Sequence, residues 1–536
     1  MAKFTFDIKG VMMDVSRNAV ISMDNWRTLV PMLKDMGYNT LLIYSEDTYE
    51  IEGEPYFGYL RGRYSKAQLR ELDDLAYANG MELIPCIQTL GHLTTLLRWR
   101  EYKFDTPDAL LVGDERNYEL IENMFRTMKD CFRTKRIHVG MDEAWSLGTG
   151  NYLRENGYEN VATIMKKHLS RVCAIAEKYG YELLIWSDMF FRGWNGGKYY
   201  SPKTTLPEEY VKALPESVIP VYWNYYNKEE SVYLDMLFNH RQLSDNTWFA
   251  GGAWTWLGYG PDNKFTLESM IPAVEACKKT KTRNFIVTVW GDNGSECSKY
   301  AVLPSLFYIG KLLSGVTDEE KIKAKFRAKY GIDFDDFMLL DKMNNPYENE
   351  ESHPSTAAKY LLFNDYFAGM FDNSIAEGTG KIYKSLSERL SVIARGSRRF
   401  AFLFDSASKL CNVLALKAEI GIRTRVAYKA GDKEELLRLA NEDYTEILKR
   451  IRAFKKAYEK QWTHDNTYNG FEVQDYRLGG LIERTDACRK RLTDYAKGKL
   501  KSIPELEYEL LTVDRLEKGR TQYFNSFTLT VTGNVM

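Results

Sequence analysis

From residue 6 to about residue 313, short apolar runs alternate with longer amphipathic stretches. The apolar runs are rich in β-branched and aromatic residues, which is typical of strands. We expect eight strands, at Ile8–Met13, Thr40–Tyr44, Glu82–Ile87, Arg136–Val139, Glu182–Trp186, Ile219–Trp223, Thr247–Ala250 and Asn284–Trp290. We expect helices between them, including Asn25–Met36, Lys66–Asn79, Val161–Tyr179 and Leu267–Lys279. Gly37, Gly80 and Gly180 each follow a helical run and precede a strand, which is where a helix is expected to end.

Strands that are each followed by a crossover segment predict a parallel (β/α)8 barrel, the TIM-barrel architecture. The alternative is an open doubly wound sheet. That fold carries a glycine-rich phosphate-binding turn after its first strand. Here the corresponding residues, 13–18, read MDVSRN. The sequence therefore favours the barrel.

After about residue 316 the pattern becomes helical and rich in lysine and glutamate. We predict two domains, a barrel over residues 1–315 and a mostly α-helical domain over residues 316–536. Helical segments are expected at Asp318–Tyr330, Ser355–Met370, Lys381–Leu410, Val413–Ala430 and Lys433–Lys460. The last residues, 524–533, read FNSFTLTVTG and look β-like. For residues 461–481 we expect a loop between helices. The alternative is that Trp462 or Arg477 reaches the barrel mouth of this chain or of a dimer partner.

Composition narrows the function classes. The 536 residues carry 73 basic and 74 acidic side chains, for a net charge of −1, which argues against a nucleic-acid binder. The N-terminal residues MAKFTFDIKG lack the apolar run of a signal peptide, and no run is long enough to span a membrane. Seven scattered cysteines without a CxxC pair suggest reduced thiols. We expect a cytoplasmic protein with no cofactor and no metal, and a homodimer as one option.

The most informative segment is KRIHVGMDEAWSLG, residues 135–148. A short apolar run ends in a glycine, and the adjacent carboxylates Asp142 and Glu143 follow at once, with Trp145 two positions later. Carboxylates supply proton transfer and charge stabilisation in sugar cleavage, and an aromatic ring offers a flat apolar wall to a sugar. Because the two carboxylates are sequence neighbours, we expect their side chains to diverge and to have unequal roles. An isolated Asp-Glu pair would more simply be a solvated loop.

The other predicted strands also end in polar or aromatic residues, and in a barrel these ends gather on one face. Ten of the eleven tryptophans precede residue 291, a bias that carbohydrate stacking would explain. The residues at the strand ends are, in chain order, Arg17; Glu46 and Asp47; His92; Asp142 and Glu143; Trp186 and Asp188; Trp223 and Tyr225; Trp254 and Trp256; Trp290 and Asp292.

These residues together resemble glycoside hydrolase family 20, the β-N-acetylhexosaminidases, over roughly residues 8–300. The family has a His-x-Gly-Gly-Asp-Glu signature after strand 4, and His138–Glu143 reads HVGMDE, with Met141 at the second glycine. Arg17 matches an arginine after strand 1, and Leu90–His92 reads LGH where the family has Pro-Gly-His. The family's small domain before the barrel and its Tyr-x-Asp motif after strand 7 are not visible.

The resemblance implies substrate-assisted hydrolysis, in which the 2-acetamido oxygen of the substrate attacks the anomeric carbon and forms an oxazoline. Glu143 would protonate the leaving oxygen, and for this its pKa must be raised by Asp142 and by desolvation. Asp142 would stay ionised and orient the acetamide. Tyr225, or else Tyr259, would support the acetamide, with His138 as a hydrogen-bonding or structural neighbour.

Substrate contacts are implied for a second group of residues. Arg17 would bind sugar hydroxyls unless it forms an ion pair at the barrel end, and Asp292 would accept from O4 and O6 unless it caps a helix. His92 would contact a hydroxyl or support the carboxylates, whereas Glu46 and Asp47 suit capping nearly as well. The walls of the sugar site would be formed by four tryptophans, Trp186, Trp223, Trp254 and Trp290. For any one of these rings, packing in the barrel core is an equally simple explanation. Trp256 suits either role.

The leading hypothesis is therefore an exo-β-N-acetylhexosaminidase acting on oligosaccharides or glycoconjugates that end in β-linked N-acetylglucosamine or N-acetylgalactosamine. A second hypothesis is a barrel glycosidase that releases a disaccharide or uses two enzyme carboxylates. A third is a glycan-binding barrel without catalysis, against which the intact Asp142–Glu143 pair argues.

Overall fold

The computed structural model describes residues 4–348, 352–513 and 517–536, and these form two compact units. The first unit contains the chain up to Ala253 together with Thr266–Trp290 and Ser305–Asp318. The second contains Trp254–Phe265, Gly291–Pro304 and the chain from Glu319 onward. Two segments that follow late strands of the barrel thus pack with the second unit. The predicted boundary at residue 315 stays a prediction.

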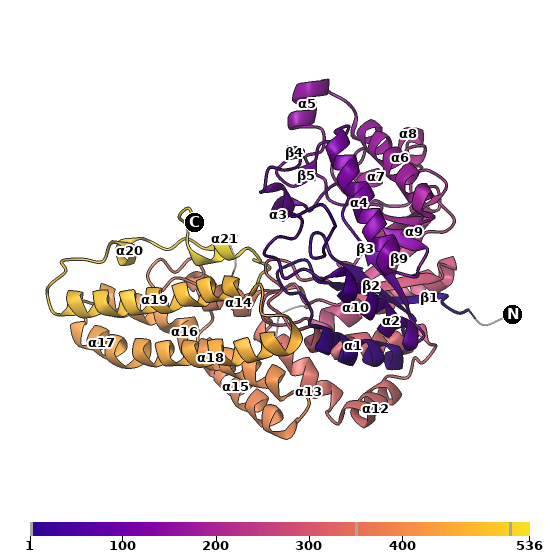
Figure 1. Cartoon of the computed structure of the whole chain (residues 1–536). Helices are drawn as coiled ribbons and strands as arrows, with labels where there is room; N and C mark the ends of the chain where they lie inside the picture. The colour runs from indigo at the N-terminus through magenta and orange to yellow at the C-terminus, as the bar shows by residue number, and fades with distance from the viewer. Residues whose placement is uncertain (1–3, 349–351, 514–516) are drawn as a thin grey trace. The chain divides into compact units, whose positions relative to one another are not determined.

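The first unit is built around a closed barrel, as predicted (Figure 1). Among the described residues, eight parallel strands close it in the order β1-β10-β9-β8-β7-β6-β3-β2. Their bounds are β1 Ile8–Asp14, β2 Thr40–Tyr44, β3 Glu82–Cys86, β6 Arg136–His138, β7 Glu182–Trp186, β8 Val218–Trp223, β9 Trp248–Gly252 and β10 Asn284–Val289. The predicted strands agree with these bounds to within two residues at each end.

The strands pair in parallel register around the ring, and β1 closes it by pairing with β10 from Ile8 opposite Asn284 to Met13 opposite Val289. Strands β2 and β8 are buried at every position. Such burial on both faces is expected where side chains fill the barrel and helices cover it. All the carboxyl ends therefore point to one end of the barrel.

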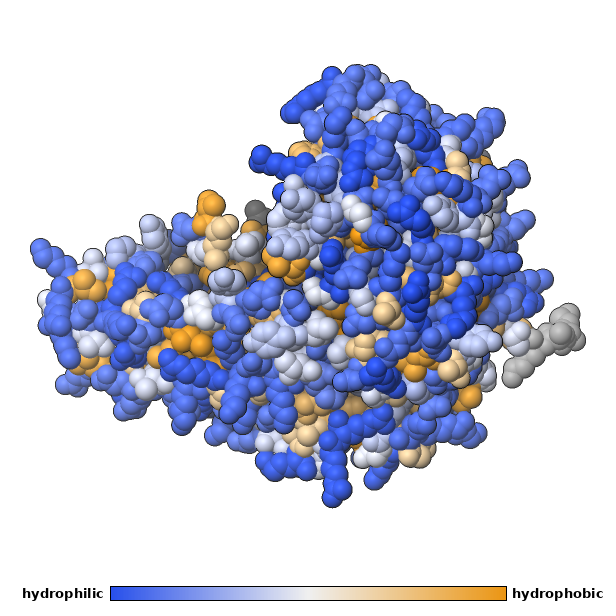
Figure 2. Space-filling view, in the orientation of Figure 1, coloured by the Kyte–Doolittle hydropathy of each residue, from blue (hydrophilic) through white to orange (hydrophobic). Residues whose placement is uncertain are grey.

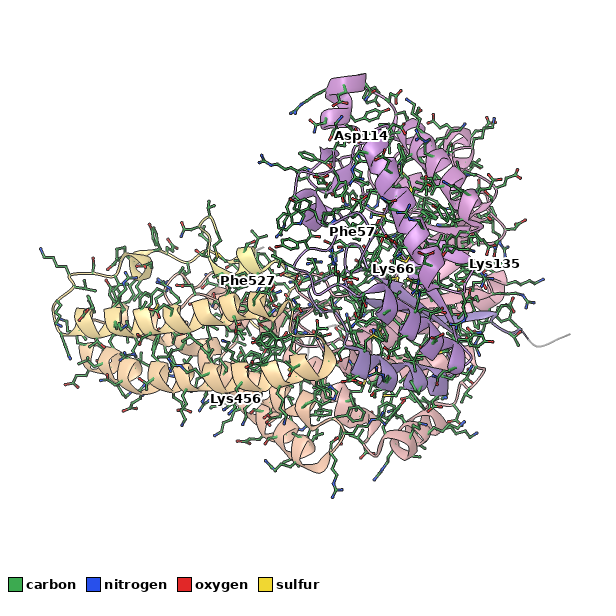
Figure 3. All side chains as sticks on the ribbon, in the orientation of Figure 1. Phe57, Lys66, Asp114, Lys135, Lys456 and Phe527 are labelled. Atoms are coloured by element: carbon green, nitrogen blue, oxygen red, sulfur yellow. The ribbon has the colours of Figure 1, made fainter. Side chains whose placement is uncertain are left out.

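The helices of the barrel begin and end at recognisable signals. Ser65 and Gln68 form a reciprocal capping box at the start of α2, whose first residue, Lys66, is labelled in Figure 3. Gly37 and Gly180 end α1 and α6 with left-handed φ angles of 112° and 71°, as predicted. The long helices after barrel strands are α1 Met23–Met36, α2 Lys66–Ala78, α4 Glu115–Cys131, α6 Val161–Tyr179, α9 Glu230–His240, α10 Asn263–Thr280 and α11 Leu303–Leu313.

Short elements occupy the loops between them. The strands β4 and β5 form a separate antiparallel pair, which the sequence did not predict. The short elements are α3 Thr94–Leu97, β4 Phe104–Thr106, β5 Ala109–Leu110, α5 Asn151–Asn156, α7 Met189–Arg192, α8 Glu208–Val211 and the 3₁₀ turn η1 Lys299–Val302.

The second unit is mainly helical, as predicted, and its longest helix has 29 residues. Helices α18 and α19 run alongside each other (Figure 1), with Lys456 on the exposed face of α18 (Figure 3). The elements are α12 Glu319–Tyr330, α13 Phe334–Met338, η2 Leu339–Met343, α14 Ala357–Phe363, η3 Asp372–Ser374, α15 Thr379–Gly396, α16 Ala401–Lys429, α17 Lys433–Arg438, the π-helix η4 Leu439–Tyr444, α18 Thr445–Asp465, α19 Phe471–Ala496, α20 Pro504–Glu507 and α21 Phe527–Val531.

Several predictions in this region were wrong. Of the expected helix Ser355–Met370 only α14, Ala357–Phe363, is α-helical, and the expected break between Leu410 and Val413 lies inside α16. The β-like segment 524–533 contains the short helix α21 instead. The edge of the Phe527 ring packs against the Phe363 ring, with centroids 4.9 Å apart, and such tertiary packing overrides weak β propensity. The expected loop at 461–481 is mostly helix, because α18 continues to Asp465 and α19 already begins at Phe471.

The visible surface is mostly hydrophilic, with hydrophobic residues in small scattered groups (Figure 2). In the part of the chain that the structure describes, no helix combines the length and apolar character needed to cross a membrane.

Candidate functional site

Asp142 and Glu143 follow β6 on a turn with an unusual backbone. Gly140, Met141 and Glu143 have positive φ angles of 71°, 71° and 50°, a region that non-glycine residues rarely adopt. Glycine is required at position 140, because a Cβ atom there would lie 2.0 Å from Oε1 of Gln88. Met141 adopts the same conformation with a side chain attached. Strain of this kind concentrates at functional sites, and here it aims two carboxylates from adjacent residues.

Asp142 is buried and held by two side chains from the segment after β3. Nε2 of His92 lies 3.2 Å from Oδ2 of Asp142, and Nε2 of Gln88 donates to Oδ1 at 2.7 Å. Oε1 of Gln88 accepts from the backbone N–H of Met141 at 3.0 Å, so one side chain fixes both the turn and the carboxylate. Burial raises the pKa of Asp142, but the charge of His92 and these hydrogen bonds outweigh it and hold the pKa below its usual value. Asp142 is therefore ionised at neutral pH.

His92 is the cationic partner of this carboxylate. Burial lowers the pKa of His92, but the charge and hydrogen bond of Asp142 outweigh this effect and raise the pKa to about 9. His92 has a φ of 56° and follows Gly91, where a Cβ atom would lie 2.9 Å from the carbonyl oxygen of Asp142. The close approach of these two turns explains the glycine and brings the imidazolium to the carboxylate.

Glu143 is the second carboxyl, and its environment favours the protonated form. Its Oε2 lies 3.8 Å from Nε2 of His92, and its Oε1 lies 3.8 Å from Nη2 of Arg192. Burial and the negative charges of Asp142 and Asp188 outweigh these two cations and raise the pKa of Glu143 to about 7. A carboxyl with this pKa can donate a proton and later accept one. Both carboxyls thus lie near the same His92 nitrogen, and the expected divergence of their side chains stays a prediction.

Asp188, which follows β7, binds the backbone of Glu143. Oδ2 of Asp188 accepts from the backbone N–H of Glu143 at 3.0 Å and from Nε of Arg192 at 3.1 Å. Nε1 of Trp223 donates to the other oxygen at 3.4 Å. Burial and the charge of Asp142 raise the pKa of Asp188 to about 6. The backbone that carries Glu143 is thus anchored to a buried carboxyl, whose charge also acts on the Glu143 side chain.

Arg17 lies beside the same group. Its Nη2 is 2.9 Å from Oε1 of Glu46 and 3.4 Å from Nδ1 of His92. The hydroxyl of Tyr44 donates to Glu46 at 3.0 Å and accepts from Nε2 of Gln88 at 2.9 Å. A continuous polar network therefore links Arg17 to the side chains that hold Asp142. Asp47 lies apart from it, since it pairs with Arg61 and Thr95.

The predicted aromatic walls fall into two groups in the barrel unit. Trp186 is fully buried and packs on the His138 ring, with centroids 4.3 Å apart, and on Trp290 at 6.0 Å. Burial lowers the pKa of His138 to about 3, so its imidazole is neutral at neutral pH, and its Nδ1 accepts from the backbone N–H of Gly140. Trp223 and Tyr225 stack with centroids 5.4 Å apart. The role of each ring toward a sugar stays a prediction.

Four candidate residues lie in segments that pack with the second unit. Trp254 stacks on Trp256, with centroids 4.2 Å apart. The hydroxyl of Tyr259 donates to Gln474 at 3.2 Å. The preference for Tyr225 over Tyr259 stays a prediction. Asp292 follows β10, and its negative charge acts on Lys359.

Arg477 bonds the segment that carries Asp292. Its Nη1 donates to the Asn293 carbonyl at 2.9 Å and to Oε1 of Glu296 at 2.6 Å, and Nη2 donates to Oδ1 of Asn293 at 3.0 Å. Nζ of Lys359 lies 2.8 Å from the other oxygen of Glu296. Trp462, the other candidate in this region, is buried and donates to Thr467 within its own unit. Contact with the barrel mouth stays a prediction for both residues.

Within the described ranges, no group of three or more histidine, cysteine, aspartate or glutamate side chains is arranged to hold a metal ion. All seven cysteines are free thiols.

Two family models match this sequence. Residues 6–246 match the catalytic domain of glycosyl hydrolase family 20, and residues 335–525 match the C-terminal domain of glycoside hydrolase 20C. The chain belongs to glycoside hydrolase family 20. Both units of this family 20 chain thus have counterparts among known domains.

Two curated relatives are hexosaminidase D from Homo sapiens and from Bos taurus. The human protein is 27% identical over 210 residues, which cover 37% of this chain and 40% of that protein. The bovine protein is 26% identical over 210 residues, which cover 37% of this chain and 57% of that protein. The match spans less than two thirds of either relative.

Solved structures also resemble part of this chain. One is an exo β-N-acetylglucosaminidase from Vibrio harveyi in complex with N-acetylglucosamine, at 14% identity, with 63% of this chain and 59% of that chain covered and a TM-score of 0.47. Another is the Streptomyces plicatus N-acetyl-β-hexosaminidase, at 16% identity, with 63% and 70% covered and a TM-score of 0.45.

The site of this family 20 chain contains three supporting residues that sequence reasoning did not assign. Gln88 bonds both the backbone of Met141 and the side chain of Asp142, while Asp188 and Arg192 contact Glu143. The sequence places Asp188 at a strand end but predicts no role for it. The four-residue spacing of Asp188 and Arg192 after a strand was an available signal, whereas nothing local marks Gln88.

Proposed function

We propose that this chain is a retaining exo-β-N-acetylhexosaminidase that removes terminal, non-reducing β-linked N-acetylglucosamine or N-acetylgalactosamine with help from the substrate's own acetamide group. The observation that carries the proposal is that the pKa values of two adjacent carboxyls are shifted in opposite directions. The pKa of Asp142 is held below its usual value, while that of Glu143 is raised to about 7. Different environments can thus give two carboxyls different roles, one as a proton donor and one as a charged group.

Glu143 would protonate the glycosidic oxygen as the bond breaks, and would afterwards take a proton from the attacking water. A pKa of about 7 suits both steps near neutral pH. Its backbone bond to Asp188 supports this role by holding the carboxyl in one direction.

Asp142 would accept the acetamide N–H and balance the positive charge that develops on the oxazolinium. Its ionised state and its fixation by His92 and Gln88 support this assignment. Family 20 is one of the substrate-assisted exceptions to the retaining mechanism that uses two enzyme carboxylates. Membership of this family therefore supports the acetamide as the nucleophile.

The remaining candidate residues would hold the sugar. Arg17 and Asp292 would bind hydroxyl groups, and Tyr225 would support the acetamide oxygen. The aromatic residues Trp186, Trp223, Trp254 and Trp290 would enclose the pyranose ring. Family membership and the two relatives named hexosaminidase D support this substrate class.

The stereochemistry of the first product tests the proposal. Proton NMR of an aryl N-acetyl-β-glucosaminide during early hydrolysis should show the β-anomer of N-acetylglucosamine first, because two displacements at the anomeric carbon restore its configuration. Initial release of the α-anomer would contradict a substrate-assisted mechanism.

A further inference from the structure

Trp145 is an exposed aromatic residue directly beside the proposed acid. The residue is 58% exposed, which is unusual for a residue of this size. The backbone N–H of Trp145 donates to the carbonyl of Glu143 at 2.7 Å in a tight turn. The backbone of Trp145 is therefore tied closely to that of Glu143.

Arg192 holds one face of this ring. Its guanidinium carbon lies 3.6 Å from the centroid of the Trp145 ring, a close cation–π contact. Arg192 is itself fixed, since Nε donates to Asp188 at 3.1 Å and Nη1 donates to the carbonyl of Gly197 at 3.1 Å. The indole is thus supported on one face, so its exposed area belongs to the opposite face and the edge.

The same arginine connects Trp145 to the interior of the proposed sugar site. The guanidinium carbon of Arg192 is 5.8 Å from the Trp223 ring centroid. Exposure increases from the buried Trp223 to the Arg192 side chain, at 12%, and is highest at Trp145. The Glu143 side chain, at 36%, is intermediate, and its Oε1 lies 3.8 Å from Nη2 of Arg192. Trp145 is therefore on the solvent side of the proposed acid.

We propose that Trp145 forms the binding platform for the leaving group, a pyranose ring that lies on its free face. This inference rests on the proposed function. A general acid acts on the oxygen shared by the departing sugar and the sugar being cleaved. The cleaved sugar occupies the side of the buried aromatic rings, so the departing sugar occupies the solvent side, where Trp145 offers a flat apolar surface to its C–H face. Arg192 is a positioning residue for this platform.

The test compares substrates that differ only in the leaving group. The leaving group of N,N′-diacetylchitobiose is a pyranose, and that of methyl N-acetyl-β-glucosaminide is methanol, which has no ring. N-acetylglucosamine serves as an inhibitor that fills only the site of the cleaved sugar. For Trp145→Ala we expect KM for the disaccharide to rise about tenfold, with kcat for the disaccharide, kcat/KM for the methyl glycoside and the inhibition constant of N-acetylglucosamine unchanged. Trp145→Phe, which keeps an aromatic face, should recover most of the disaccharide affinity.

Tyr158 provides a matched control, because it is an exposed aromatic residue on the loop between α5 and α6, and Tyr158→Ala should change none of these values. Equal losses by Trp145→Ala on both substrates would overturn the inference, because Trp145 would then only support Glu143 or the fold. An unchanged KM for the disaccharide would overturn it as well. If the wild-type protein cleaves neither substrate, the proposed function fails, whereas normal wild-type cleavage with either of the first two results removes only the leaving-group platform.

Discussion

Nε2 of His92 lies 3.2 Å from Oδ2 of Asp142. This contact separates the protonation states of two neighbouring carboxyls, because it stabilises the charge of Asp142, which in turn raises the pKa of Glu143. A turn with three residues at positive φ brings the groups together. The chemistry that we propose depends on this separation.

Replacing His92 with glutamine removes the cation that faces both carboxyls. The pKa of Asp142 and that of Glu143 should both rise, because each loses an opposite charge. We expect kcat to fall about a hundredfold and both limbs of the pH profile of kcat/KM to move to higher pH. A profile that keeps its limbs while only its height falls would contradict the electrostatic role of His92.

Asp188→Asn should have the opposite effect on Glu143. The negative charge of Asp188 raises the pKa of Glu143, so its removal lowers that pKa. The alkaline limb of kcat/KM, which reports loss of the Glu143 proton, should move to lower pH. Asp73→Asn is a suitable control because Asp73 is a buried carboxyl of the same unit that pairs with Arg133, and it should leave the limb in place. Movement to higher pH, or none, would exclude this role for Asp188.

Gly140→Ala tests the close packing under the turn that carries Asp142 and Glu143. The new Cβ atom would lie 2.0 Å from Oε1 of Gln88 at a φ of 71°, so both steric overlap and backbone strain act against it. We expect the free energy of unfolding to fall by about 3 kcal/mol. Gly180 has the same φ of 71° and open space around it, so Gly180→Ala should cost only about 1 kcal/mol. Equal losses in chemical denaturation would show that contact with Gln88 is unimportant.

Arg477→Ala tests whether the second unit supports sugar binding. Arg477 makes three hydrogen bonds to Asn293 and Glu296, close in sequence to Asp292. Loss of these bonds should loosen the segment that carries Asp292 and raise KM for an acetamido glycoside about tenfold. Arg484→Ala is matched to it, since Arg484 lies on the same helix and pairs with Asp365. An unchanged KM for Arg477→Ala, or an equal rise for Arg484→Ala, would rule out this support.

The fold was predictable because its signals are local and repeated. The strands have continuous apolar runs, and glycines mark the ends of α1 and α6. Residues 524–533 were mispredicted because the packing of Phe527 on Phe363 involves residues far apart in the sequence. The segment 461–481 was mispredicted because most of it, including Gly479 and Gly480, lies within α18 and α19.

The candidate site was predictable only in part. Carboxylates after a strand reveal their chemistry through position, so Asp142 and Glu143 could be found. Gln88 could not, because its importance comes from two hydrogen bonds to a turn more than fifty residues away. The raised pKa of Glu143 was expected from Asp142 and desolvation, but the contribution of Asp188 required the three-dimensional contact.

The most direct test of the central claim compares hydrolysis of an aryl N-acetyl-β-glucosaminide with hydrolysis of the matching β-glucoside, which lacks the acetamide. Wild type, Asp142→Asn and Glu143→Gln should be measured together. We predict that wild type cleaves only the acetamido substrate and that both variants lose most of their kcat. Comparable cleavage of the plain glucoside would contradict the account, because the acetamide would then not be the nucleophile.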